Sequence, residues 1–310
     1  MLCKSPVVKI IFISLLSLFV QVTSADSNSA ARLNDSAKAA GSKVSYQSLN
    51  GALLPATKLP NSSEYIFSAA PRESVEDGNK IYGPVAEYLS RVTGKKIVYK
   101  HPGTWGVYQG AMQHGEYDLV FDGPHFNGWR VTKIQHNMLV KVPGEHIFVA
   151  LVKKENTRIQ DIKQLAGYTV CAHAPPNLGT LTLLDQFTNP ARQPIIVSTD
   201  GWKNIYDGLV AGKCAAAVVP LAKLEQFEKN GAKTRIVYRA KVLPDNAFSA
   251  GPRLSAEDQA KIVQALLSPE GMDATAALRQ KYAAGQAFVQ ATNQEYASLA
   301  VFLRNEWGYY

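Results

Sequence analysis

Short apolar runs alternate with longer amphipathic segments from Tyr65 onward. The runs have the length of strands, and the segments between them repeat apolar residues at helical spacing. This alternation is typical of α/β proteins with largely parallel sheets. The first part of the pattern predicts strands over residues 65–70, 96–100 and 118–122, and helices over residues 78–93 and 106–114 and from about residue 124.

The same pattern then restarts, after an apolar strand over residues 146–154 that is suited to crossing between two lobes. The second part predicts strands up to residue 175 and over residues 194–199 and 214–220, with helices over residues 178–187 and 201–213. Residues 234–254 read as an extended return, and residues 255–310 as helical, with a capping box at 255–258. Two similar units joined by two extended crossings predict a hinged pair of Rossmann-like lobes with a cleft between them.

The first 25 residues have the layout of a cleaved signal peptide. Lys4 and Lys9 precede an apolar run from Ile10 to Val20, and small residues follow it. The alternative, an uncleaved anchor, is disfavoured because a membrane span needs about 20 apolar residues. Residues 26–60 are rich in Ser, Asn, Ala and Gly and predict a flexible linker. The first lobe is then expected over residues 61–147 with 246–310, and the second over 148–245.

The charge of the chain is basic but dispersed. Removing Lys4 and Lys9 with the signal lowers the formal charge from +8 to +6, and no run of lysines and arginines occurs. Nucleic-acid binding usually needs a clustered basic face, so we expect anionic small ligands or the cell surface as partners instead. Beyond the signal, two cysteines remain, Cys171 and Cys214, which either pair or are small buried residues.

Motifs for catalysis are missing from the sequence. The six histidines show no short-spaced pair with a carboxylate on one helix face, so no metal site is predicted. The phosphate-binding P-loop, the dinucleotide glycine fingerprint and the Gly-x-Ser-x-Gly elbow are absent as well. We therefore expect neither a cofactor nor an enzyme activity.

Ligands of open α/β sheets bind beyond the carboxyl ends of the strands, where helix N-termini offer backbone N–H groups. This rule selects the loops at residues 69–74, 102–108, 121–127, 172–180 and 198–202.

The segments "AAPRES", "YGPVAEYLSRVTGKKI", "GEYDLVFDGPHF" and "IQDIKQLAGYTVCAHAP", in this order, resemble the phosphate, phosphite and phosphonate solute-binding family of bacterial ABC importers. The resemblance covers residues 65–268 and implies a type II periplasmic binding-protein fold, a periplasmic location, an inner-membrane ABC permease as partner and a monomer. It implies that a small solute like phosphonate or phosphate binds between the lobes. Arg72, His125 and His173 together with Asp122 would suit a small anion that bears a donor group, such as an aminophosphonate or another zwitterion.

One turn departs from the family pattern. Where the family has a Ser-Thr-Ser-Gly turn that cradles the phosphorus oxyanion, this chain has Pro175 and Pro176. Each proline removes a backbone donor. Asn177 fits an N-cap, and Gly179 and Thr180 offer amides in the first helical turn, so an anion is expected to find fewer partners here.

The remaining candidate residues lie in the other loops. We expect Trp105 and Trp202 to offer flat apolar faces and Tyr82 and Tyr108 to add hydroxyl tips, with packing beneath the loops as the alternative. Arg72 is a candidate for bidentate hydrogen bonds to an oxyanion, with an exposed surface charge as the alternative. His125 and His173 are candidate hydrogen-bond donors to an anion, and the alternative for each is a bond to a nearby backbone carbonyl.

Asp122 ends a buried strand and is expected to accept from a ligand amine or hydroxyl. The alternative is a salt bridge to Arg72 or a local turn cap. The sequence thus predicts an exported solute-binding subunit, and a ligand sensor for a receptor kinase or an enzyme on the same fold stay as alternatives.

Overall fold

The computed structural model describes residues 46–49, 52–55 and 63–304, which fall into two units, residues 1–57 and 58–310. The predicted signal peptide and most of the predicted linker lie outside the described residues. In the first unit, β1 (Tyr46–Leu49) and β2 (Ala52–Pro55) form an antiparallel pair. The sequence pattern showed no period in this segment, so the hairpin was not predicted.

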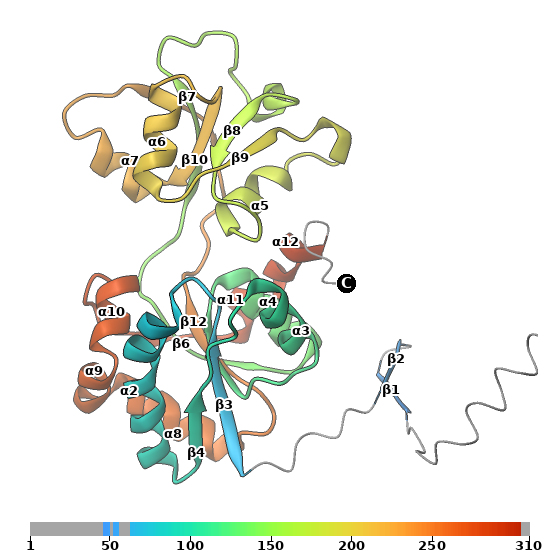
Figure 1. Ribbon diagram of the computed structural model, residues 1–310, viewed down its shortest axis with the longest axis vertical. Coiled ribbons are helices and arrows are strands. Elements are labelled where there is room, and N and C mark those ends of the chain that lie inside the picture. Colours follow the sequence, from blue (N-terminus) through green and yellow to red (C-terminus); the bar gives the residue numbers. More distant parts are fainter. Residues whose placement is uncertain (1–45, 50–51, 56–62, 305–310) are drawn as a thin grey trace, which may run out of the picture. The chain divides into compact units, whose positions relative to one another are not determined.

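The second unit holds two sheets, each with helices on both faces (Figure 1). We call the six-stranded sheet with its helices the first lobe and the five-stranded sheet with its helices the second lobe. The first sheet has the order β13 (Val289–Gln290), β6 (Asn137–Lys141), β12 (Ala247–Ala250), β5 (Leu119–Asp122), β3 (Glu64–Ala69) and β4 (Lys96–Tyr99). The second has the order β11 (Thr234–Arg239), β7 (Phe148–Lys153), β10 (Ala216–Pro220), β8 (Thr169–Ala172) and β9 (Ile195–Ser198).

The two sheets repeat one arrangement, as the restarting sequence pattern predicted. Strands β4, β3 and β5 are parallel, and so are β9, β8 and β10. The expectation of largely parallel sheets is wrong for the remaining strands, because β12 and β7 arrive from the opposite lobe and pair antiparallel with β5 and β10. Strands β6, β13 and β11 add further antiparallel pairs.

The helices flank the sheets in the order that the sequence pattern predicted, with exceptions at α7 and in the helical region that contains β13. The first lobe contains α2 (Val75–Thr93), α3 (Trp105–Gln113), α4 (Pro124–Lys133), α8 (Ala256–Leu267), α9 (Pro269–Ala274), α10 (Ala276–Tyr282), α11 (Asn293–Tyr296), η3 (Ala297–Ala300) and α12 (Val301–Arg304). The second contains η1 (Ile162–Leu165), α5 (Leu178–Leu184), η2 (Pro190–Arg192), α6 (Trp202–Val210) and α7 (Leu221–Phe227). The sequence reading missed α7, and it assigned the short strand β13 to a helical region.

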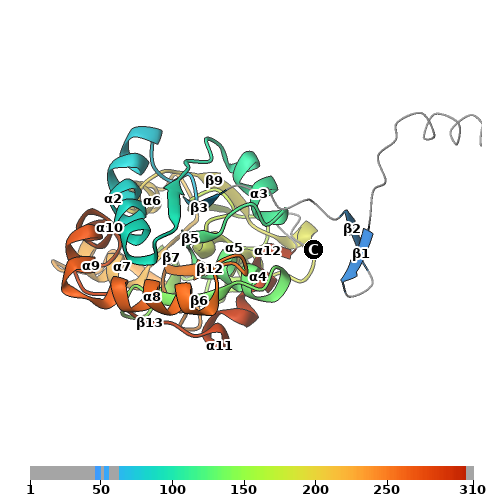
Figure 2. The same cartoon turned by 90° about the horizontal axis from the view of Figure 1, so that it is seen from below.

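Capping side chains fix where the helices begin. The Ser74 side chain accepts from the Asp77 N–H at the start of α2, and Ser255 does the same for Asp258 at the start of α8, as its capping sequence predicted. In the first lobe, α2, α8, α9 and α10 gather on one face of the sheet, and α3 and α4 lie on the other (Figures 1 and 2).

Two segments connect the lobes, residues 142–147 and 240–246, and they are hydrogen-bonded to each other. His146 and Leu243 form an antiparallel bridge, and the Val142 N–H donates to the Asn246 carbonyl. This confirms the two-strand hinge. Strand β7, which we expected to cross between lobes, lies within the second sheet instead, and the crossing is the segment before it. The exact lobe boundaries stay a prediction.

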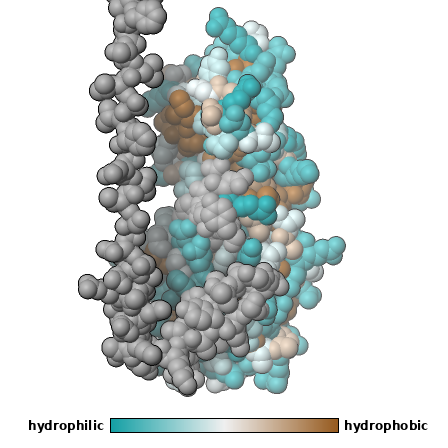
Figure 3. Space-filling view, turned by 90° about the vertical axis from the view of Figure 1, so that its right-hand side faces the viewer, coloured by the Kyte–Doolittle hydropathy of each residue, from teal (hydrophilic) through white to brown (hydrophobic). Residues whose placement is uncertain are grey.

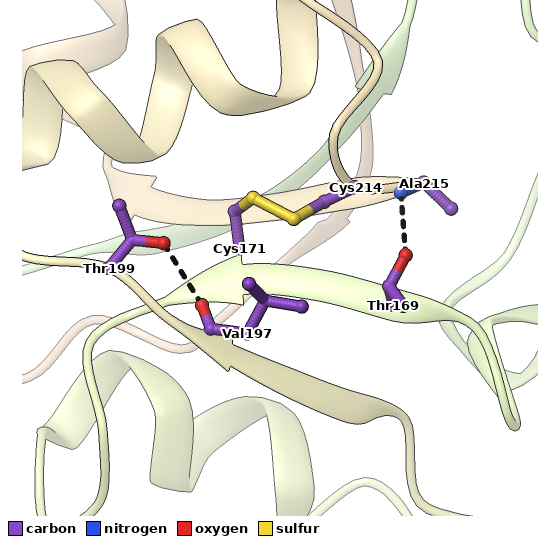
Figure 4. Close-up of a disulfide and its surroundings, with 6 residues drawn as sticks. All are labelled: Thr169, Cys171, Val197, Thr199, Cys214 and Ala215. Carbon is purple, nitrogen blue, oxygen red and sulfur yellow. Dashed lines mark hydrogen bonds between the residues drawn. A yellow bond between two sulfur atoms is a disulfide. The ribbon is translucent and has the colours of Figure 1, made fainter.

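Cys171 in β8 and Cys214 before β10 form a disulfide (Figure 4). Both cysteines are buried, and the pair ties the parallel core of the second sheet to the loop that follows α6. Beside it, the Ala215 N–H donates to Thr169 Oγ1 at 3.3 Å. The structure thus favours pairing over the alternative of two free buried thiols.

The surface shown in Figure 3 is largely hydrophilic, and its hydrophobic residues lie in separate groups. Ile195 in the edge strand β9 and Val107 in α3 are the most exposed large apolar residues of the described part, at 58% each. None of the helices described here is both long enough and apolar enough to span a membrane.

Gly128 sets the contact between α4 and the C-terminal helices. A Cβ at this position would lie 2.3 Å from the Tyr296 carbonyl oxygen and 3.0 Å from the Ala300 nitrogen, both backbone atoms that cannot rotate away. We expect Gly128→Ala to lower the free energy of unfolding by about 1 to 3 kcal/mol, measured by chemical denaturation. Gly110→Ala in α3 is the control, because its Cβ would meet no atom within 4 Å. It should be neutral or stabilising, by up to about 1 kcal/mol. Equal stability of Gly128→Ala and the parent would contradict this packing.

Candidate functional site

A cavity of about 810 Å³ lies between the lobes and is lined by both of them and by the hinge. Its walls come from the loops after β3, β5, β8 and β9 and from the start of α3, which are the loops that the strand-end rule selected. The hinge contributes His146, Asp245 and Asn246, and the end of α10 contributes Lys281 and Tyr282.

Six of the predicted site residues line the cavity, and five do not. The six are Arg72, Trp105, His125, His173, Asn177 and Trp202. The five are Tyr82, Tyr108, Asp122, Gly179 and Thr180, all of them fully or almost fully buried. Their polar groups bond within the protein, and the five residues lie behind the cavity wall.

The buried Asp122 carboxylate bonds to two arginines at once. Its Oδ1 accepts from Arg72 Nη2 at 2.9 Å, and its Oδ2 accepts from Arg130 Nη1 at 3.1 Å. The Tyr108 hydroxyl and the Gly123 N–H also donate to it. Burial alone would raise the pKa of Asp122, but the two guanidinium groups hold it below its ordinary value. Asp122 is therefore ionised. The structure shows the salt bridge between Asp122 and Arg72, the alternative to a ligand contact.

Two guanidinium groups around one carboxylate leave an excess positive charge. Arg130 is fully buried, whereas 28% of the Arg72 side chain is exposed, so the excess is available at Arg72. A guanidinium has five N–H donors, and within the described residues the Arg72 side chain uses one hydrogen bond, to Asp122. Its Cζ lies over the ring of Trp105, 5.8 Å from the ring centre, which is within the range of a cation–π contact.

His125, near the start of α4, connects the two lobes. Its Nε2 lies 2.9 Å from the carbonyl oxygen of Pro176 in the turn before α5. The ring is 2% exposed and packs against Phe126, with ring centres 4.3 Å apart. Burial lowers the pKa of His125 to about 4, although Asp122 opposes this shift. The imidazole is therefore neutral at neutral pH.

Some donors of the turn before α5 form hydrogen bonds inside the turn. Asn177 Oδ1 accepts from the Gly179 N–H at 3.0 Å, and the Thr180 hydroxyl donates to the His173 carbonyl at 2.6 Å. Gly179 is packed so closely that a Cβ there would lie 2.6 Å from the Phe148 ring. Pro175 and Pro176 have no N–H, so this turn has fewer donors for a ligand than a serine-rich one.

Aromatic rings form the wall on the second-lobe side. Trp202 begins α6 and meets the His173 ring edge-on, with ring centres 4.4 Å apart, and Phe148 lies 6.2 Å from Trp202. His173 Nδ1 lies 3.7 Å from the exposed carboxylate of Asp200. Burial lowers the pKa of His173, and Asp200 opposes the shift. The cavity thus offers flat apolar faces opposite the charged Arg72.

Sequence reasoning missed a second buried carboxylate beside the cavity. Glu73 is 1% exposed at its side chain and bonds to Lys281 Nζ at 2.8 Å and to the Tyr282 hydroxyl. The loop containing Glu73 was selected, but Lys281 and Tyr282 come from α10, in a helical region without any motif. Among the described residues that line the cavity, Lys281 pairs with Glu73, whereas Arg72 shares its partner Asp122 with Arg130.

No group of three or more His, Cys, Asp or Glu side chains in the described part of the chain is arranged to hold a metal ion.

The comparisons with known proteins agree with this architecture. The profile of a family described as ABC transporter, phosphonate, periplasmic substrate-binding protein matches residues 67–296. No curated protein matches the sequence significantly.

Solved structures share the fold at low sequence identity. XAC2383 from Xanthomonas citri bound to ATP is 11% identical, with a TM-score of 0.60 over 79% of this chain and 100% of that one. PhnD1 from Prochlorococcus marinus in complex with methylphosphonate is 14% identical, with a TM-score of 0.54 over 78% and 97%. A binding protein component of an ABC phosphonate transporter from Pseudomonas aeruginosa is 13% identical, with a TM-score of 0.50 over 78% and 84%. The predicted type II fold is confirmed.

Replacing Asp122 tests whether its negative charge stabilises the fold by balancing the charges of Arg72 and Arg130. Asp122→Asn keeps the shape but leaves two guanidinium groups without a counter-charge, so we expect the free energy of unfolding to fall by about 3 to 5 kcal/mol in chemical denaturation. Asp200→Asn, an exposed carboxylate at the same cavity, should change it by less than about 0.5 kcal/mol. Equal effects of the two substitutions would contradict the proposed role of Asp122.

Stability should depend on pH through two buried histidines. Burial lowers the pKa of His125 to about 4 and that of His136 to about 3, from 6.5 in an exposed chain. Below pH 6.5 the unfolded chain binds protons that the folded one does not, so stability falls as the pH falls. Each histidine should remove about 1.4 kcal/mol per pH unit between pH 6.5 and its own folded pKa.

Denaturation curves at several pH values measure this slope. His125→Gln and His136→Gln should each reduce it, and substitution of the exposed His114 should leave it unchanged. A stability that stays constant between pH 6.5 and 4.5 would contradict neutral buried histidines.

Proposed function

The chain belongs to the family of periplasmic substrate-binding proteins of phosphonate ABC transporters, and we propose that it binds a small phosphorus oxyanion in the cavity between its lobes. Its role is that of a periplasmic solute-binding subunit, as the sequence predicted. The Arg72 guanidinium supports the oxyanion assignment, because it is partly exposed at the cavity and carries the excess charge of the Asp122 cluster. Charge-assisted hydrogen bonds from arginine are well suited to phosphonate and phosphate oxygens.

The ligand also carries a small organic or apolar part in this proposal. Trp105 borders Arg72, and Trp202 with Phe148 faces the cavity from the second lobe. Such rings favour contact with carbon substituents over contact with water. One structural relative, PhnD1, is described in complex with methylphosphonate, a molecule with one methyl group and one phosphonate group. We therefore choose methylphosphonate as the first probe.

Transport completes the proposal. The signal peptide is cleaved on export, the lobes close about the hinge on the ligand, and the closed form delivers it to an inner-membrane permease. Closure of this kind needs a ligand that binds the closed form more tightly than the open one. The protein acts as a monomer, without catalysis and without binding nucleic acid.

Calorimetric titration tests the site. We expect the folded protein to bind methylphosphonate and Arg72→Ala to weaken binding about tenfold to a hundredfold or more, because a charge-assisted bond is lost. Arg91→Ala is the control, since Arg91 is exposed on α2 and does not line the cavity. Absence of binding by methylphosphonate, phosphite and phosphate would contradict the ligand class, and unchanged affinity in Arg72→Ala would contradict the site.

A further inference from the structure

His125 offers the cavity a hydrogen-bond acceptor rather than a donor. Its Nε2 lies 2.9 Å from the Pro176 carbonyl oxygen, and a carbonyl can only accept, so Nε2 carries the hydrogen. A neutral imidazole has one N–H, and Nδ1 is then a bare lone pair. Among the described residues this Nδ1 has no hydrogen-bond partner, although the ring is 98% buried and lines the cavity. An unpaired buried acceptor is costly, so a ligand donor would stabilise it.

The surroundings of His125 keep it neutral. The ionisable groups that act on it are Asp122 from β5, Arg72 from the loop after β3 and Arg130 from its own helix, and Pro176 contributes a carbonyl from the second lobe. Both arginines oppose a positive charge on the ring, as burial does, and the pKa of His125 is about 4. The acceptor character of Nδ1 therefore persists well below neutral pH.

The acceptor and a donor flank the same glycine. A Cβ built on Gly123 would lie 3.3 Å from His125 Nδ1 and 3.4 Å from Arg72 Nη2, so the two nitrogens lie on the same side of this residue. A side chain at this position would crowd both of them. The same residue is the N-cap of the ten-residue helix α4 and places no capping side chain over the helix N-terminus. A ligand group that bonds to both nitrogens must accept from Arg72 and donate to His125.

We propose that the site selects an oxyanion that retains one acidic proton, such as a hydrogen phosphonate or hydrogen phosphate. Its P–OH group donates to His125 Nδ1, and its other oxygens accept from Arg72. This inference rests on the proposed function and names the protonation state of its ligand. An ammonium donor is disfavoured at this point because the adjacent Arg72 is cationic. A fully ionised oxyanion has no proton to donate. Its oxygen lone pair would repel the lone pair of Nδ1, so the site would bind it more weakly.

The proline-rich turn has a specific part in this selection. In place of donating to the ligand, it accepts from His125 through the Pro176 carbonyl and so fixes which ring nitrogen is bare. The contact joins the two lobes, so the second lobe sets the tautomer of a residue in the first.

Two ligands of similar shape and equal charge, one with an acidic proton and one without, test whether the site requires that proton. At a pH of about 5, below its second pKa, methylphosphonate is a monoanion with one P–OH group. Methanesulfonate is also a monoanion but has no proton to donate. Calorimetry on the full exported chain should give an affinity for methylphosphonate at least about tenfold higher than for methanesulfonate.

Variants of His125 assign the preference to this residue. His125→Gln can turn its amide to donate or accept, so we expect the ratio of the two affinities to fall toward one, while His114→Gln keeps the parent ratio. Should His125→Gln fail to fold, the parent protein still gives a second test. Its affinity for methylphosphonate should fall about tenfold per pH unit once the pH exceeds the second pKa of the ligand.

The possible outcomes distinguish the two proposals. Binding of methylphosphonate together with equal or tighter binding of methanesulfonate would overturn the selection and leave the proposed function in place. An affinity for methylphosphonate that is constant across its second pKa would also overturn it. Failure of every phosphorus oxyanion to bind would overturn the proposed function itself, and the selection with it.

Discussion

The binding side of this molecule depends on one buried carboxylate that two arginines share. Asp122 joins the end of β5 to the loop after β3 through Arg72, to α4 through Arg130 and to α3 through Tyr108. Burying an unpaired charge is costly, so these four elements are fixed in mutual position wherever the ion cluster is intact. The cluster has one more positive charge than negative charge, and its geometry leaves that charge at the cavity. The same interaction thus stabilises the first lobe and makes it attractive to an anion.

The second lobe complements this arrangement by shape and by one carbonyl group. Its turn before α5 has two prolines, and the Gly179 N–H and the Thr180 hydroxyl bond within the turn, so the lobe offers the ligand aromatic faces and fewer free donors. The Pro176 carbonyl receives the Nε2–H of His125 and leaves the other ring nitrogen as an acceptor. In this chain, the first lobe therefore contributes Arg72 and Trp105 to the cavity, and the second contributes Trp202 and Phe148.

Much of this architecture could be predicted from the sequence, because α/β alternation and strand-end loops follow local rules. Arg72, Trp105, His125 and Trp202 were found at the cavity because they directly follow strands or begin helices there. Arg130 could not be found in this way, since it lies inside α4 and its partner is known only when α4 packs against β5. Lys281 and Tyr282 reach the cavity from far along the chain. The Cys171–Cys214 pair likewise depends on how α6 returns the chain to β10.

A crystal structure with bound methylphosphonate would test the central claim, that the first lobe holds the oxyanion, most directly. The account predicts phosphonate oxygens within hydrogen-bond distance of Arg72 and of His125 Nδ1, beside Gly123, with the methyl group against the tryptophan rings. A phosphonate group bound instead by the backbone amides at the start of α5, away from Arg72, would contradict it.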